Sequence, residues 1–74
     1  MSELKKRAQN LRFRVARMRI THGVTIKGLA EQIDYTKEYT SAVLRGFYES
    51  ETLCEKLESL LDEIEPEDNL MVAL

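Results

Sequence analysis

The residues of this sequence with catalytic or ligand-binding chemistry are one cysteine, one histidine and thirteen acidic side chains. Cys54 is a lone thiol, so no disulfide can form within the chain, and a lone thiol suits a reducing cytosol. His22 has no cysteine or histidine at ligand spacing, which argues against a metal site. The late carboxylates are spaced along a solvated helix face, and the chain has no phosphate-binding glycine loop or nucleophile elbow. We expect no enzyme, no metal, no cofactor and no small-molecule ligand.

The basic side chains could also bind a ligand, and they are unevenly distributed along the chain. Residues 1–30 carry eight Lys or Arg against one Glu, whereas residues 49–74 carry one Lys against nine acidic residues. The formal charge of −2 therefore hides a strong dipole. Such an asymmetry is typical of nucleic-acid contact or of an acidic tail, and it also arises when solvated helix faces are sorted by sign.

Length and composition limit the class of protein. A chain of 74 residues, 43% of them hydrophobic, is enough for one small domain with a modest core. No run of eighteen apolar residues is present, so we expect no membrane span. The charged N-terminus is not followed by an apolar segment, which argues against a signal peptide. These features favour a cytoplasmic protein.

Helical periodicity predicts an all-α fold, a compact bundle of four to five helices. A long helix is expected over residues 3–20. Two short helices joined by a tight turn follow between Thr25 and Gly46, the second over residues 36–45. A leucine-rich helix then continues to about residue 65, where Pro66 ends it. Residues 1–66 are therefore expected to form one domain, and residues 67–74 an apolar tail.

The first helix carries two opposed apolar faces. One is expected to lie in the core, and its residues are Leu4, Ala8, Leu11, Val15 and Met18. The other is formed by Phe13, Ala16 and Ile20, and it must be covered by the tail, by a second subunit or by another protein. The apolar residues of the tail are Leu70, Met71, Val72, Ala73 and Leu74. They either complete a monomeric core on this face or form an oligomer contact.

The segment from Gly23 to Gly46 resembles the helix-turn-helix of the Xre/Cro-like family of small, phage-type transcriptional regulators. The matching residues are Gly23-Val24-Thr25 at the opening, Leu29-Ala30-Glu31 at the centre and Arg45-Gly46 at the close. The resemblance covers about residues 10–64. It implies a lambda-repressor-like fold and a nucleoid-associated repressor, a homodimer that binds a double-stranded DNA operator with a recognition helix over 36–45.

The resemblance also implies roles for single residues. The residues matching base-contacting positions are Lys37, Glu38, Ser41 and Ala42. The residues matching phosphate-contacting positions, or able to join them, are Arg19, Thr25, Lys27, Arg45 and Tyr48. Lys37 would donate to guanine, Glu38 would accept from cytosine N4, and Ala42 would touch a thymine methyl. The expected dimer or partner contacts are Phe13, Ile20, Leu70, Met71, Val72 and Leu74.

Several residues depart from the family pattern and keep a second hypothesis open. Ile26 stands where the family often has glutamine, and Asp34 where it often has glycine. Leu44 stands where some members have a glutamate that pairs with the residue matching Arg19. Asp34 and Glu38 also dilute the positive charge that phosphate binding needs. The alternative function is a protein-binding modulator, an antirepressor or co-repressor that keeps the fold and binds a partner repressor. RNA binding by the arginine-rich first helix is a third hypothesis.

Overall fold

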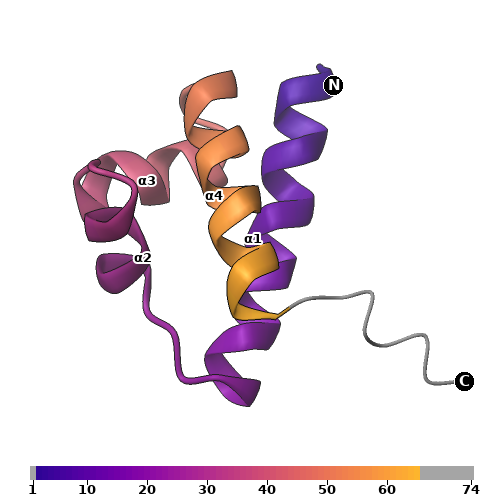
Figure 1. Cartoon of the computed structure of the whole chain (residues 1–74). Coiled ribbons are helices and arrows are strands. Elements are labelled where there is room, and N and C mark those ends of the chain that lie inside the picture. The colour runs from indigo at the N-terminus through magenta and orange to yellow at the C-terminus, as the bar shows by residue number, and fades with distance from the viewer. Residues whose placement is uncertain (1, 66–74) are drawn as a thin grey trace, which may run out of the picture.

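The computed structural model describes residues 2–65 and contains four helices over that range. They are α1 (Glu3–Thr21), α2 (Ile26–Gln32), α3 (Lys37–Leu44) and α4 (Glu51–Ile64). Figure 1 shows α1 and α4 side by side along their lengths, with α2 and α3 packed beside this pair. The all-α prediction is confirmed, with the lower of the two expected numbers of helices. The tail and its apolar residues lie outside the described part of the chain.

Each of the four described helices begins at a hydroxyl side chain. The four N-caps accept a hydrogen bond from the backbone N–H three residues later, at 3.0 to 3.2 Å. A hydroxyl N-cap stabilises a helix start by about 1 kcal/mol. The capping residues are Ser2, Thr25, Thr36 and Ser50. These bonds fix the first turn of α2 and α3, the two helices that the resemblance places against DNA.

Three residues between the helices have a positive φ angle, and all three lie where the sequence predicts a helix end or turn. Gly23 follows α1 with φ 70°, and Gly46 follows α3 with φ 89°. Asp34 lies in the turn between α2 and α3 with φ 66°. A short polar side chain tolerates this left-handed conformation better than most residues do. The turn expected at Asp34 is therefore confirmed without a glycine.

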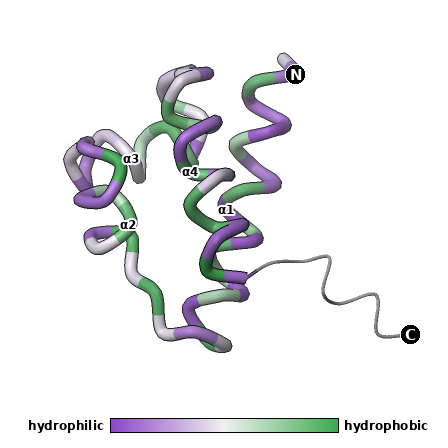
Figure 2. The backbone as a smooth tube through the Cα atoms, viewed as in Figure 1, coloured by the Kyte–Doolittle hydropathy of each residue, from purple (hydrophilic) through white to green (hydrophobic). Residues whose placement is uncertain are grey.

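The core lies between the four helices, and Figure 2 shows apolar backbone segments facing one another across it. Its most fully buried side chains are Met18, Leu53, Leu57, Leu61, Val15, Val43, Thr40 and Cys54. Cys54 is a packing residue, because its side chain is almost fully buried in this core. The same burial raises the pKa of its thiol and favours the protonated form. Leu4, expected in the core, is only half-buried, because it lines an open hollow beside Glu51 at the start of α4. No helix within residues 2–65 is long and apolar enough to cross a membrane.

Candidate nucleic-acid interface

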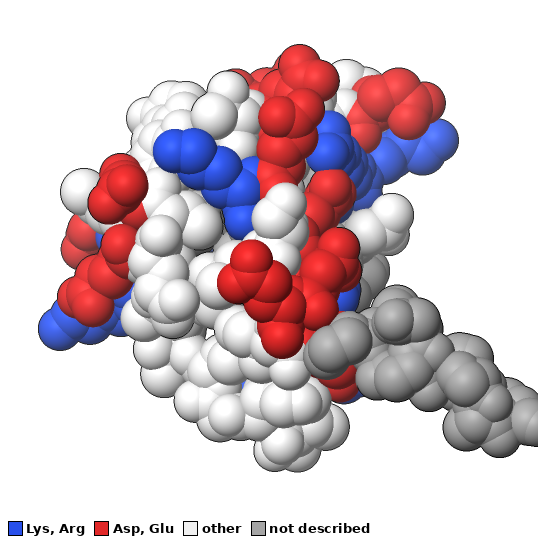
Figure 3. All heavy atoms as spheres, in the orientation of Figure 1, with Lys and Arg blue, Asp and Glu red and all other residues white. Residues whose placement is uncertain are grey.

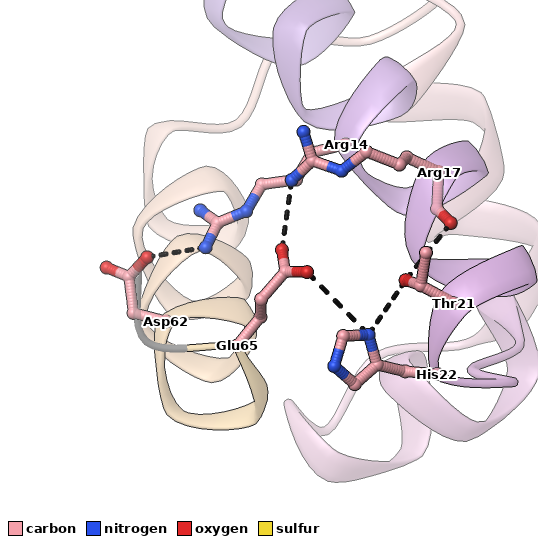
Figure 4. Close-up of polar contacts among 6 residues, drawn as sticks. All are labelled: Arg14, Arg17, Thr21, His22, Asp62 and Glu65. Carbon is pink, nitrogen blue, oxygen red and sulfur yellow. Dashed lines mark hydrogen bonds and ion pairs between the residues drawn. The ribbon is translucent and has the colours of Figure 1, made fainter. Parts of the chain in front are cut away.

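The opposite charges at the two ends of the sequence meet in the fold. Three arginines on one side of α1 form ion pairs with carboxylates on or directly after α4, and Figure 4 shows two of these pairs. The acidic side chains gather over α4 on the face drawn in Figure 3. The shortest distances are 2.7 Å for Arg7–Glu58, 2.8 Å for Arg14–Asp62 and 2.9 Å for Arg17–Glu65. Ion pairs within the domain therefore neutralise part of the charge asymmetry between the two ends of the sequence.

Two further arginines of α1 lie on the side that faces α3. Arg12 and Arg19 are seven residues apart, two helical turns, and so lie on the same face of α1. Neither forms an ion pair within residues 2–65. Together with Arg45 they line a hollow of about 280 Å³, which we call the arginine hollow. Its other lining residues are Val15, Ala16, Ile26, Ser41 and Leu44.

The outward face of α3 continues directly from the arginine hollow. The four residues predicted to contact bases line one hollow of about 340 Å³ together with Arg45 and Phe47. Ser41 and Arg45 line both hollows, so the two form one continuous surface. The opposite face of α3 is buried through Thr40, Val43 and Leu44. The helix is therefore held in the core by one side, and on the other side Lys37 and Glu38 are exposed while Ser41 and Ala42 are half-buried.

The start of α2 lies beside the arginine hollow. Ile26, its first residue, is one of the lining residues. Thr25 and Lys27 on either side of it are exposed, as expected for phosphate-contacting residues. The Thr25 hydroxyl accepts the Gly28 N–H at 3.0 Å as the N-cap. The structure thus brings Arg19 and Arg45 together at the arginine hollow, and Thr25 and Lys27 are the exposed neighbours in the chain of its lining residue Ile26.

Tyr48, expected to join the phosphate-contacting set, lies elsewhere. Its ring stacks on Tyr39 with centroids 5.7 Å apart, and Tyr39 stacks on Tyr35 at 5.6 Å. The Lys56 ammonium lies 5.6 Å from the centroid of Tyr35 and ends the row. Tyr48 lines neither hollow at α3, so the structure does not bring it together with the other predicted residues.

Two residues of this surface were not assigned to it from the sequence. Arg12 lines the arginine hollow, and its spacing of two turns from Arg19 was the signal that could have identified it. Phe47 lines the α3 hollow, and it is 70% exposed. No pattern in the sequence distinguishes Phe47 from the neighbouring Tyr48 for this place.

No protein-family model, no curated protein and no solved structure matches this chain significantly.

Of the two acidic residues that depart from the family pattern, one lies on this surface and the other does not. Asp34 lines a separate hollow, between the end of α2 and α4, together with Glu55 and Glu63. Glu38 remains on the outward face of α3, beside Lys37. Leu44 is buried, and Arg19 forms no ion pair among the described residues. Of the two acidic departures, only Glu38 lies on the surface formed by α3 and the arginine hollow.

This surface has the chemistry that a nucleic-acid backbone requires. Guanidinium groups bind phosphate in a bidentate manner, and three of them surround the arginine hollow. The eight residues of α3 span about 12 Å, and an α-helix fits the major groove of B-DNA, which is also about 12 Å wide. The small side chains of Ser41 and Ala42 leave the helix surface open between the charged residues.

Proposed function

We propose that this protein is a sequence-specific regulator of transcription that binds double-stranded DNA with α3 in the major groove. One observation carries the proposal. The α1 arginines that face α4 are ion-paired, whereas Arg12 and Arg19, which face α3, are not paired among the described residues. Free guanidinium groups are thus concentrated at the helix whose outward face matches a DNA-reading helix. A repressor-like action on an operator, as the resemblance implies, is part of the same proposal.

The roles divide between the two connected hollows. Arg12, Arg19 and Arg45 bind phosphates on one side of the major groove and set the position of the domain. Lys37 and Glu38 supply the donor and the acceptor that distinguish base pairs in the groove. Dimerisation on a two-fold operator would double both sets of contacts.

The test of the phosphate contacts is a binding titration with random duplex DNA at several salt concentrations. Each phosphate contact adds about 0.9 to the slope of log affinity against log salt. Arg12→Gln is therefore expected to lower the slope by about 0.9. Arg14→Gln removes the same charge from the same helix and is the matched control, because Asp62 already holds that guanidinium at 2.8 Å. Equal slopes for the two variants would contradict the proposal, as would the absence of binding at low salt.

The test of base recognition is selection from a randomised duplex library. Lys37→Ala is expected to relax the preference at one base position in each half-site, with a loss of discrimination of about 1–3 kcal/mol. Its salt slope should change less than its sequence preference. If the wild-type protein enriches no sequence at all, specific recognition by α3 is excluded.

A second function is favoured by one feature of the same surface. Glu38 places a carboxylate on the outward face of α3, and it repels DNA phosphates unless it meets a base donor. The second candidate is therefore a modulator that binds a partner regulator through this face. Glu38→Gln separates the two functions, because it should strengthen random-duplex binding by a DNA regulator and have no effect where the wild type binds no DNA.

A further inference from the structure

The outer side of α1 exposes large apolar side chains. Phe13 is 61% exposed and Ile20 is 86% exposed. Phe13 is two residues away from both Leu11 and Val15, and so lies about 200° around the helix from these core residues. Phe13, Ala16 and Ile20 form an apolar stripe on the side of α1 opposite the core, which we call the outer stripe.

Basic side chains border the outer stripe on both sides. Arg17 lies on the border toward α4, where it pairs with Glu65 and its side chain remains 62% exposed. Arg12 and Arg19 lie on the border toward α3, where they line the arginine hollow. An occupant that matches this surface combines apolar side chains with negative charge.

A second copy of the domain does not match it. Two outer stripes placed face to face would bring the bordering arginines of both copies close together. Like charges opposed across an interface are costly, and although Glu65 neutralises Arg17, Arg12 and Arg19 have no ion-pair partner among the described residues.

The C-terminal segment of the chain has the required composition. Residues 67–74 read EDNLMVAL, two acidic residues followed by an almost wholly apolar run. The described chain ends at the edge of the outer stripe, because the Glu65 carboxylate lies 2.9 Å from Arg17 and 3.7 Å from His22 at the end of α1. Figure 4 shows Glu65 between these two side chains.

The segment is also long enough. The nine residues after Glu65 can extend over about 30 Å. The outer stripe runs over the eight residues from Phe13 to Ile20, about 10 Å along the helix axis, and α1 is about 10–12 Å in diameter. The distance to be crossed is therefore well within reach of the same chain.

We propose that residues 67–74 dock on the outer stripe of their own chain. Glu67 and Asp68 follow Glu65 at the border toward α4, where Arg17 lies, and the apolar run from Leu70 to Leu74 covers Phe13 and Ile20.

The test uses the full chain, which contains no tryptophan, and reports docking without DNA. Phe13→Trp places a single fluorophore on the outer stripe. Its emission is expected to be blue-shifted and protected from acrylamide. Serine substitutions at Leu70, Met71 and Val72 should shift the emission to the red and remove the protection. Phe47→Trp is the matched control, because Phe47 is 70% exposed on the α3 surface and should not respond to the same serines.

Two outcomes overturn the proposal. One is an emission from Phe13→Trp that is the same with and without the serine substitutions. The other is a protection that increases with protein concentration, which would place the segment on a second copy. Absence of DNA binding with an intact fluorescence response would contradict the proposed function alone.

Discussion

Thr40 offers a direct test of the core, because its side chain is buried without a polar partner. It lies in α3 and is 0% exposed, and its Oγ1 forms no hydrogen bond within residues 2–65. A buried hydroxyl in this state loses its hydration without compensation, which costs about 1–3 kcal/mol. Thr40→Val replaces the hydroxyl by a methyl group and keeps the branched shape, and the two residues have similar helix propensities. The variant is expected to be more stable by about 1–3 kcal/mol.

This gain is large for a domain of this size. At about 0.05–0.15 kcal/mol per residue, 74 residues give a total stability of about 4–11 kcal/mol. Each kilocalorie per mole shifts the Tm of such a domain upward by about 4–8 °C. The increase should therefore be evident both in thermal unfolding and in the urea midpoint, with an unchanged m value.

The assay is urea unfolding followed by far-UV circular dichroism, with Thr52→Val as the matched control. Thr52 is exposed on α4, so the same substitution there should change the stability by less than about 0.5 kcal/mol. If Thr40→Val is no more stable than the control, the Thr40 hydroxyl has a partner in solution and the argument from desolvation is wrong.

Three other variants or treatments test features of the fold by the same unfolding assay or by thiol chemistry. Thr36→Ala removes the N-cap bond to Tyr39 at 3.0 Å and should lower the stability by about 1 kcal/mol, measured against Thr52→Ala. Gly46→Ala should lower it by about 1–2 kcal/mol through backbone strain alone, because φ is 89° and a Cβ there would meet no atom within 4 Å. Burial raises the pKa of Cys54, so its thiol stays protonated at neutral pH; an aromatic disulfide reagent should modify it only as fast as the domain unfolds, and rapid labelling of the native protein would contradict this.

The features that local chemistry decides could be predicted from the sequence. Ser2 and Thr36 cap their helices because a hydroxyl before an apolar-periodic segment satisfies the free N–H groups of the first turn. Asp34 takes the left-handed turn conformation for an equally local reason. The buried face of α1 follows from spacing alone, and only Leu4, in the first turn beside an open hollow, is less buried than expected.

The features that depend on how distant segments meet could not be predicted. Helical spacing groups Arg12 with Arg19 and separates it from Arg14, but it does not say which side of the helix meets carboxylates. Only the docking of α4 gives Arg14 a carboxylate, 48 residues away, and leaves Arg12 facing α3. Phe47 lines the α3 hollow and Tyr48 does not for a similar reason. The Tyr48 ring stacks on Tyr39, and helical spacing cannot predict the direction of side chains beyond Gly46, where α3 has ended.

The difference between paired and unpaired arginines also decides which charges are relevant to the proposed function. The formal charge of −2 is unfavourable for a DNA-binding protein, but it averages over groups that a DNA molecule at α3 would not meet equally. At an ionic strength of 0.1 M the Debye length is about 10 Å, comparable to the 8–10 Å between packed helix axes. The carboxylates that pair with α1 lie on the far side of that helix from the arginine hollow, so they are both neutralised and screened. A phosphate bound at α3 would meet Arg12, Arg19, Arg45 and Lys37 against the single carboxylate of Glu38, so the charged groups that line the two hollows are net positive although the chain is acidic overall.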